Sequence, residues 1–210
     1  MNYLELKEVI KSALKEGLPG EEAQYSIAPG SRNRLSQMDL NLAKVRKAGV
    51  LALIENRAQT PYLLLTERTI YPGAHSGQIS FPGGKHELED SDFKETAIRE
   101  TEEEVGLRQE EYQIISPLTQ LYIPPSNFLV HPYLAFADNA TDLTREEKEV
   151  AKIHRIPFTA FLDESNIQET SVEVSGGFRI KTKAYLIEGL TVWGATAMII
   201  SEIRALVRRH

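Results

Sequence analysis

Apolar residues recur along the chain with two different periods, and each period predicts a different kind of element. Apolar positions three or four residues apart between residues 2 and 16 predict an amphipathic helix that ends at Gly17. The same spacing between residues 193 and 209 predicts a helix that closes the sequence. Short aliphatic and aromatic runs predict strands over residues 49–55, 61–66, 78–81, 112–115, 128–137, 148–156, 172–174 and 178–187.

The stretches between these elements are rich in glycine, proline and polar residues. Turns or loops are therefore expected over residues 18–33, 56–60, 122–127 and 175–177. Residues 34–47 are expected to form a partly helical connector, and residues 158–162 a short helix. Helices placed between and after mixed strand runs predict an α/β domain in which a mixed sheet is covered by helices.

Residues 83–107 carry the most informative pattern in the chain. A glycine loop is followed by a helix expected to begin between residues 90 and 92 and to end at Gly106. The residues expected to face the core are Ala97, Ile98, Thr101 and Val105. Three carboxylates with the spacing i, i+3 and i+4 share one face of this helix: Glu100, Glu103 and Glu104.

Like charges on one helix face repel each other, and a cation over them removes the repulsion. Arg99 is one residue from Glu100, about 100° around the helix, so it is not expected to neutralise the whole group. Oxygen ligands without histidine or cysteine suit Mg²⁺ or Mn²⁺ better than Zn²⁺. The alternative is that these glutamates form the solvated face of a charged helix.

Composition limits the classes of function. A length of 210 residues fits one domain, or one domain with a terminal extension. A net charge of −6 argues against sequence-independent nucleic-acid binding, and no apolar run is long enough to span a membrane. The acidic residues near the N-terminus do not fit a signal peptide and the chain has no cysteine, so a cytoplasmic location is expected. A homodimer is left open.

One extended motif identifies a family. The sequence Arg-Glu-x-x-Glu-Glu-x-Gly from Arg99 to Gly106, preceded by Phe-Pro-Gly-Gly at residues 81–84, resembles the signature of the Nudix hydrolases. The resemblance implies an α/β/α sandwich with a mixed sheet, formed by a Nudix hydrolase domain over residues 45–210. Residues 1–44 are then an N-terminal helix and connector that pack on this core.

The resemblance also implies a site and a reaction. Glu100, Glu103 and Glu104 would bind Mg²⁺ or Mn²⁺, with the Gly83 carbonyl as a further ligand. The reaction would be hydrolysis of a diphosphate linkage in a nucleoside diphosphate derivative, with a metal-bound water attacking phosphorus. Arg99 would hold the helix or its neighbouring loop by ion pairing.

Residues before the acidic helix resemble the coenzyme A pyrophosphatase branch of this family. They are residues 64–69, the His-Ser-Gly at 75–77 and Asp90, whereas Thr69, Pro72 and Glu87 depart from that pattern. The implied substrate is coenzyme A or its thioesters, cleaved to 3′,5′-ADP and the phosphopantetheine half. The implied substrate contacts are Arg68, His75, Gly84 and Lys85, although His75 could instead hold its own loop in place. Alternatives are the same chemistry on ADP-ribose or a dinucleotide, and a non-catalytic nucleotide sensor.

Three assignments stay open. Asp90 lies at the family's acidic position relative to the glycines, but Ser91 or Asp92 could instead serve as the helix N-cap. The general base is Glu100 or a glutamate of residues 145–150, where Glu149 fits the family pattern best. Five cations form either a solvated face or a contact with a substrate phosphate: Arg32, Arg34, Lys44, Arg46 and Lys47.

Overall fold

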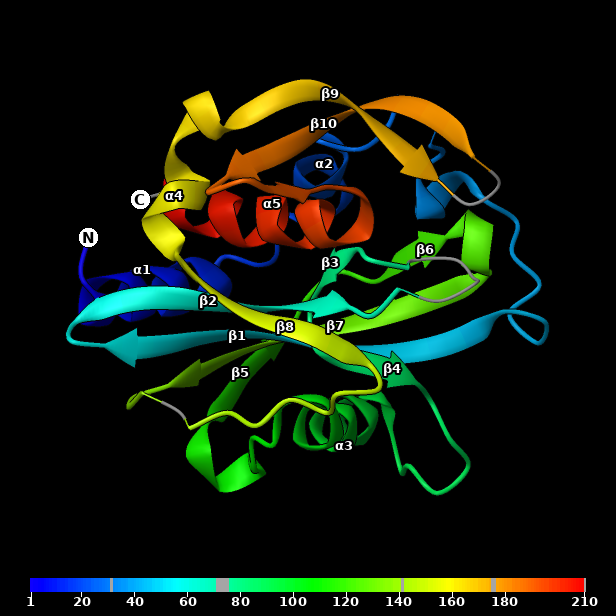
Figure 1. Cartoon of the computed structure of the whole chain (residues 1–210). Helices are drawn as coiled ribbons and strands as arrows, with labels where there is room; N and C mark the ends of the chain where they lie inside the picture. Colours follow the sequence, from blue (N-terminus) through cyan, green and yellow to red (C-terminus); the bar gives the residue numbers. More distant parts are fainter. Residues whose placement is uncertain (31, 71–75, 141, 175–176, 210) are drawn as a thin grey trace.

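A mixed sheet lies between helix α3 (Phe93–Val105) on one face and helix α5 (Gly194–Arg208) on the other (Figure 1). The computed structural model describes residues 1–30, 32–70, 76–140, 142–174 and 177–209. This arrangement confirms the α/β/α sandwich expected from the sequence.

Among the described residues, eight strands form the sheet: β1 (Arg46–Arg57), β2 (Thr60–Arg68), β3 (Ile79–Ser80), β4 (Gly83–Lys85), β5 (Gln113–Pro117), β6 (Leu121–Ile123), β7 (Phe128–Ala137) and β8 (Val150–Pro157). The strand order is β3-β2-β1-β7-β5. In addition, β4 pairs with β1, β6 with β7 and β8 with β2. β1 and β7 pair in parallel, and the other pairs are antiparallel.

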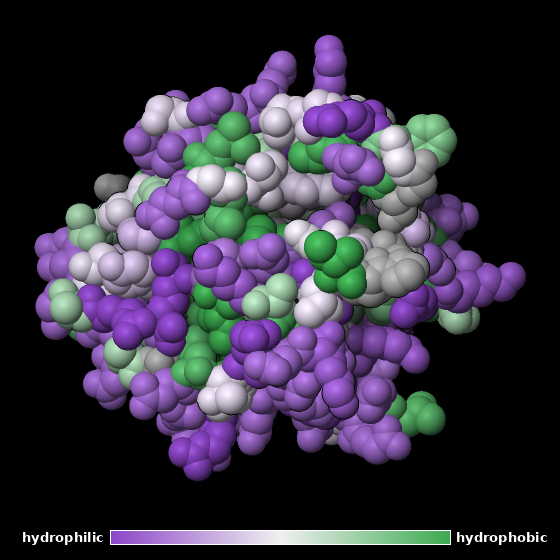
Figure 2. Space-filling model, viewed as in Figure 1, coloured by the Kyte–Doolittle hydropathy of each residue, from purple (hydrophilic) through white to green (hydrophobic). Residues whose placement is uncertain are grey.

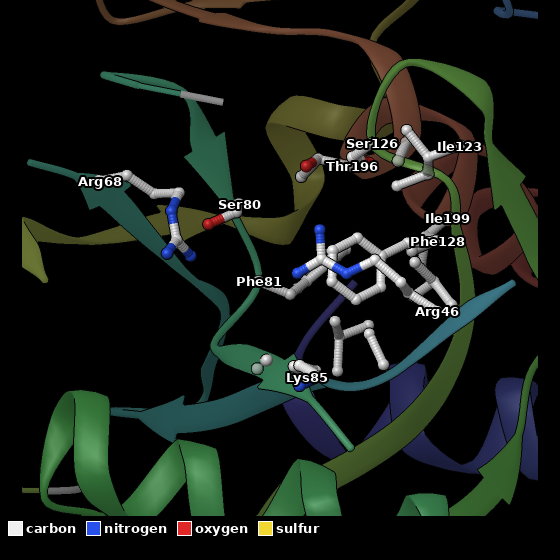
Figure 3. Close-up of a pocket in the computed structure, with 16 residues that line it drawn as sticks. Arg46, Arg68, Ser80, Phe81, Lys85, Ile123, Ser126, Phe128, Thr196 and Ile199 are labelled. Carbon is white, nitrogen blue, oxygen red and sulfur yellow. The ribbon is translucent and has the colours of Figure 1, made fainter. Parts of the chain in front are cut away.

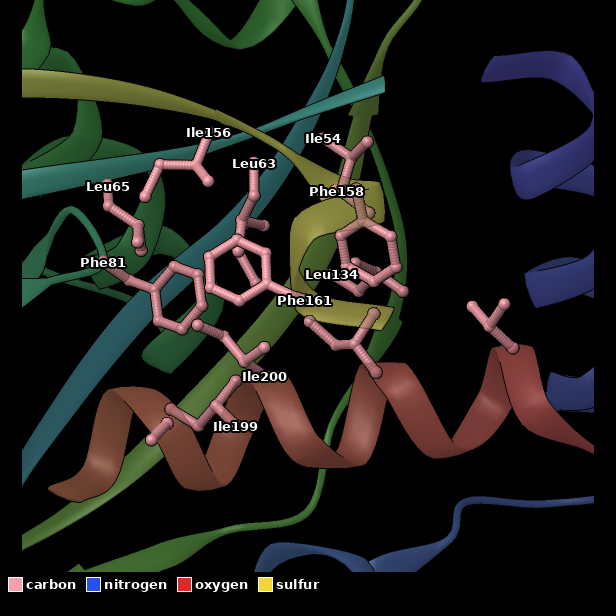
Figure 4. Packing of buried hydrophobic residues seen from close by; sticks show 14 of the residues in the cluster. Ile54, Leu63, Leu65, Phe81, Leu134, Ile156, Phe158, Phe161, Ile199 and Ile200 are labelled. Carbon is pink, nitrogen blue, oxygen red and sulfur yellow. The ribbon is translucent and has the colours of Figure 1, made fainter. Parts of the chain in front are cut away.

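The central strand β1 contributes to two hydrophobic clusters because its side chains alternate between the faces of the sheet. Leu51 and Leu53 belong to the cluster under α3, and Ala52 and Ile54 belong to the larger cluster under α5. Figure 4 shows the larger cluster, in which Ile200 of α5 points toward the aromatic rings and aliphatic side chains above it. The alternating side chains of β1 therefore pack against both helical layers, α3 on one face of the sheet and α5 on the other.

The N-terminal helix α1 (Tyr3–Lys15) is present as expected and begins at an N-cap in which Asn2 and Glu5 bond each other's backbone. Its apolar face packs into the α5-side cluster, and the Tyr3 ring meets Phe136 edge-on at 5.8 Å. The division of the chain into residues 1–44 and 45–210 stays a prediction.

The loop expected over residues 18–33 contains a short helix, α2 (Gly20–Tyr25), so that prediction was wrong in part. The helix is held by contacts that no local pattern reveals. The buried amide of Gln24 donates to the Thr119 carbonyl at 2.8 Å and to Glu202 Oε2 at 3.0 Å. Tertiary hydrogen bonds thus stabilise a helix of six residues, which is too short to be stable alone.

Three further strands were missed, and each is short. The glycine loop at residues 83–84 is part of strand β4, β6 lies at the start of the loop expected over residues 122–127, and β11 (Leu190–Val192) had no prediction. β11 pairs with β10 (Phe178–Ile187), which also pairs with β9 (Ile167–Val174). This second sheet lies over α5 (Figure 1).

β9 begins five residues before the strand expected over residues 172–174, and the other elements agree with the sequence prediction to within a few residues or are single turns. Helix α4 (Phe158–Leu162) has the expected bounds. Short 3-10 turns cover Leu35–Gln37, Gln109–Glu111, Pro124–Ser126 and Glu164–Asn166. In the part of the chain that the structure describes, no helix is both long and apolar enough to cross a membrane.

Candidate active site

Helix α3 presents the acidic face at a defined position. Asp92 is its N-cap and accepts a hydrogen bond from the Glu95 N–H at 2.8 Å, and Gly106 ends it with a left-handed φ of 70°. Ala97, Thr101 and Val105 are buried against the sheet, as expected. Ile98 is only partly buried, so its expected place in the core was wrong.

Two glycines let α3 approach the sheet closely. Gly49 of β1 and Gly84 of β4 are register partners. A Cβ at Gly49 would lie 2.2 Å from the Phe93 carbonyl oxygen, and a Cβ at Gly84 would lie 2.3 Å from the Glu100 carboxylate. The missing side chains at Gly49 and Gly84 thus leave room for the α3 backbone at Phe93 and for the Glu100 carboxylate. By alternation along β4, Gly83 and Lys85 face the other side, toward α5.

Glu104 is the most deeply buried of the three carboxylates. It accepts a hydrogen bond from the Gly83 N–H at 3.2 Å, and its Oε1 lies 3.5 Å from Arg68 Nη1. Burial raises the pKa of Glu104 to about 7, and the charges of Glu100 and Glu149 add to this, whereas Arg68 and the Gly83 N–H oppose it. A carboxylate with a pKa near neutrality lies in an environment short of positive charge.

The other two glutamates differ in exposure. Burial raises the pKa of Glu100 above its ordinary value, although Arg99 lowers it. The side chain of Glu103 is 59% exposed and points toward Arg99. One buried carboxylate (Glu104), one partly buried carboxylate (Glu100) and one exposed carboxylate (Glu103) therefore form the acidic face.

Arg99 binds more of this face than its position on the helix suggested. Its Nη1 lies 3.0 Å from Glu100 Oε1 and 3.2 Å from Glu103 Oε2, so it partly neutralises two of the three glutamates. Its Nε and Nη2 donate to the two carboxylate oxygens of Asp90 at 2.9 and 3.0 Å. Asp90 is thus the ion-pair partner of Arg99, and Asp92 is the helix N-cap. The sequence had left open which of these residues caps the helix.

The donor set fits a divalent cation. Glu100 and Glu104 are both desolvated, with pKa values raised by burial, and binding of a cation would offset this cost. As the side chains stand, no group of three histidine, cysteine or acidic residues within the described ranges is close enough to hold an ion. In this arrangement Glu100 and Glu103 both point toward Arg99.

A cavity of about 430 Å³ lies above β1, β4 and β7, on the α5 side of the sheet (Figure 3). Its walls are mainly apolar, with three cationic side chains: Arg46, Arg68 and Lys85. The other lining residues are Ala48, Val50, Ser80, Phe81, Gly83, Gly84, Ile123, Ser126, Phe128, Val130, Ala195, Thr196 and Ile199. Figure 2 shows one face of the molecule, which is mostly hydrophilic with hydrophobic residues gathered across its middle.

The structure brings most residues singled out in the sequence to this cavity or to the acidic face. Arg68, Gly83, Gly84 and Lys85 line the cavity. Glu149 is one residue before Val150, the strand partner of Arg68, and its charge raises the pKa of both Glu100 and Glu104. His75 lies outside the described residues.

Of the five connector cations, Arg46 lines the cavity. Arg32 donates to the Tyr122 carbonyl, Arg34 lies over the Tyr25 ring and Lys47 over the Phe93 ring. Sequence reasoning missed Ser126 and Phe128, which reach the cavity only because β7 pairs in parallel with β1. Phe128 begins β7, whereas Ser126 lies in the 3-10 turn before that strand, and neither position gains meaning until the pairing of β7 with β1 is known.

Comparison with known proteins decides the family. Residues 45–173 match the family model of the NUDIX domain, which is more than half of the chain. The chain belongs to the Nudix family. Family membership supports pyrophosphohydrolase activity, the hydrolysis of a diphosphate linkage.

Relatives extend over most of the chain. The Nudix hydrolase NudL of Yersinia enterocolitica is 34% identical over 163 residues, which cover 77% of this chain and 81% of that protein. NudL of Photorhabdus laumondii is 32% identical over 148 residues, covering 70% and 78%. A crystal structure of RenU, a Nudix hydrolase from M. smegmatis, superposes with a TM-score of 0.54 at 13% identity, covering 78% of this chain and 86% of that one. The last comparison supports the fold alone.

Proposed function

We propose that this Nudix protein hydrolyses the diphosphate bond of coenzyme A and its derivatives, giving 3′,5′-ADP and (acyl-)4′-phosphopantetheine. The observation that carries the proposal is the position of Arg68. This residue lines the cavity and also lies beside the buried carboxylate of Glu104. A group bound in the cavity is therefore next to the acidic face.

The cavity suits a ligand with both charged and apolar parts. Arg68 and Lys85 supply positive charge at the β4 end, where a diphosphate would lie. Lys85 has no carboxylate partner within the described ranges, so its charge is available to a ligand. The apolar walls formed by Val50, Phe81 and Ile199 would cover less polar parts of the substrate.

Nudix hydrolases generally use divalent metal ions. In this chain Glu100, Glu103 and Glu104, with the Gly83 carbonyl, would hold Mg²⁺ or Mn²⁺, because oxygen donors without nitrogen or sulfur suit these ions. Such an ion, when bound, offsets the charge of a diphosphate and lowers the pKa of a bound water. Arg99 keeps its bond to Asp90 and holds the helix against the β4 edge.

Two glutamates are candidates for accepting the proton of the attacking water. Glu149 follows the loop that packs on α3 and electrostatically influences both Glu100 and Glu104. Glu100 lies closer to β4, against Gly84. Glu149 is the better base, because Glu100 would be occupied as a ligand.

Product analysis tests the substrate. The purified protein is incubated with Mg²⁺ and, in separate reactions, coenzyme A, ADP-ribose and a dinucleoside polyphosphate. Release of 3′,5′-ADP and 4′-phosphopantetheine at the highest kcat/KM is expected from coenzyme A. A higher kcat/KM for ADP-ribose or the dinucleotide would overturn the substrate assignment and leave diphosphate hydrolysis in place.

The remaining expectations concern partners and location. A small nucleotide substrate follows from the proposed reaction. The absence of nucleic-acid and membrane partners, the cytoplasmic location and a homodimer stay predictions.

A further inference from the structure

Arg46 lies at the opposite end of the cavity from the carboxylates. Its guanidinium carbon lies 4.0 Å from the centre of the Phe128 ring, and Figure 3 shows the side chain extending over the cavity. Throughout the described part of the chain, no carboxylate lies within ion-pair distance of it. Stacking on an aromatic face orients a guanidinium while its N–H groups stay free to donate.

Strand geometry places Arg46 well away from the acidic face. Arg46, Ala48 and Val50 alternate onto the cavity side of β1, and Val50 is the register partner of Gly83. Four residues of extended strand span about 13 Å. Gly83 marks the acidic end of the cavity, because its N–H donates to Glu104. The distance from this end to Arg46 is therefore longer than a single phosphate group. A ligand that reaches both ends needs two separate anionic groups.

A hydroxyl group lies at the same end of the cavity as Arg46. Ser126 Oγ is buried and has no hydrogen-bond partner in the described structure, and Ser126 lines the cavity. A buried hydroxyl left unpaired costs free energy, which a bound acceptor would offset. Arg46 and Ser126 together offer a guanidinium and a hydroxyl, the donors that suit phosphate oxygens.

The turn that carries Ser126 is held in place by its neighbour Asn127. The Asn127 side chain donates to the Lys44 carbonyl at 2.9 Å and accepts from the Tyr122 hydroxyl at 2.9 Å. Its carbonyl accepts from the Arg46 N–H at 2.9 Å. The backbones of Arg46 and Ser126 are thus fixed relative to each other before a ligand binds, which lowers the entropy cost of binding.

We propose that Arg46 and Ser126 form a subsite for a second anionic group of the substrate, a phosphate monoester on the ribose, separate from the diphosphate at the acidic face. This inference rests on the proposed function and names the residues that would make the enzyme select a 3′-phosphorylated nucleotide. Arg46 supplies the charge, and Ser126 donates its hydroxyl hydrogen to a phosphate oxygen.

The test compares Arg46→Met with the unsubstituted protein on coenzyme A and on 3′-dephospho-coenzyme A, with Mg²⁺ present. Arg46 is exposed, so the substitution leaves the core intact. We expect KM for coenzyme A to rise about tenfold, the size of one charge-assisted hydrogen bond, with kcat retained. KM for the dephospho form stays the same, and Arg46→Lys restores part of the selectivity.

Lys44→Met is the matched control, because Lys44 is an exposed cation of the same connector that does not line the cavity. It changes the net charge equally and is expected to leave both KM values unchanged. An equal change for both substrates in Arg46→Met, or no change in either, would overturn the subsite. So would an equal effect of Lys44→Met on selectivity.

Binding measurements separate failure of the subsite from failure of the proposed function. If the unsubstituted protein hydrolyses neither substrate, the proposed function fails, and calorimetry with 3′,5′-ADP and AMP still tests the subsite. We expect the unsubstituted protein to bind 3′,5′-ADP about tenfold more tightly than AMP, and Arg46→Met to lose that difference. Equal affinities in the unsubstituted protein would refute the subsite.

Discussion

Arg99 and Asp90 form a bidentate ion pair, with Arg99 Nε 2.9 Å from Asp90 Oδ1 and Nη2 3.0 Å from Oδ2. Asp90 also accepts hydrogen bonds from the Glu87 N–H and the Thr96 hydroxyl. The pair ties the loop after β4 to the middle of α3. It therefore holds the acidic face at a fixed position relative to the β4 backbone.

Asp90→Asn should lower the free energy of unfolding by about 3 kcal/mol, because the partly buried guanidinium of Arg99 loses the buried carboxylate that it pairs with. Arg99 holds the pKa of Asp90 well below its ordinary range, so this stabilisation is present above about pH 4 and is lost as the pH falls further. Urea unfolding at pH 7 and below pH 4 measures both effects. Asp92→Asn is the control, since asparagine is an equally good N-cap; equal losses in both variants would contradict the role of the pair.

Glu103→Gln and Glu104→Gln should each lower kcat by roughly three orders of magnitude or more while the protein stays folded, because a metal ligand is lost. Steady-state kinetics with Mg²⁺, with circular dichroism as the folding check, measures this. Glu102→Gln is a matched control on the same helix, as Glu102 is exposed and belongs to neither the cavity nor the proposed ligands. Near-normal turnover in the first two variants would show that the ligand assignment is wrong.

The raised pKa of Glu104 predicts a pH dependence of stability in the metal-free protein. The folded state holds this proton up to about pH 7, whereas the unfolded chain releases it at the ordinary value of 4.5. Stability therefore falls as the pH rises between these values, by about 3 kcal/mol from this group. Unfolding curves in a chelator should show this fall, and Glu104→Gln should lack it. Parallel curves for the two proteins would refute the shift.

Gly84→Ala should reduce activity more than stability. The added methyl group would lie 2.3 Å from the Glu100 carboxylate, which can move because it ends a flexible side chain. Displacing a proposed metal ligand should lower kcat by roughly tenfold or more, with only a small change in melting temperature. Gly30→Ala is the control, because no atom of the described residues lies within 4 Å of its added Cβ. Unchanged kcat in Gly84→Ala would argue against a role for Glu100.

Glu149→Gln tests the general base. If Glu149 accepts the proton from water, kcat should fall by about 10²- to 10⁴-fold, and the acidic limb of the pH–rate profile should disappear. Glu147→Gln is the matched control in the same segment, since Glu147 is exposed and pairs with Arg145. A Glu149→Gln enzyme that keeps its pH profile would move the assignment to Glu100.

Local patterns in the sequence determined the elements and the chemistry they carry. The i, i+3 and i+4 spacing places Glu100, Glu103 and Glu104 on one face of a helix whatever the helix packs against. The period of apolar residues likewise predicts α1, α5 and the long strands β1, β2 and β7, because burial of one face requires that period. The extended motif around Arg99 was enough to indicate the Nudix family.

Tertiary structure decided which residues meet across the chain. α2 forms because Gln24 finds partners at Thr119 and Glu202, far along the sequence. The parallel pairing of β1 with β7 brings Arg46 beside Phe128, and the pairing of β1 with β4 places Lys85 on the cavity side. Of five similar cations in the connector, only the folded arrangement distinguishes Arg46. Local sequence sets periodicity and propensity, whereas side-chain partners across strands depend on pairing energies summed over the whole sheet.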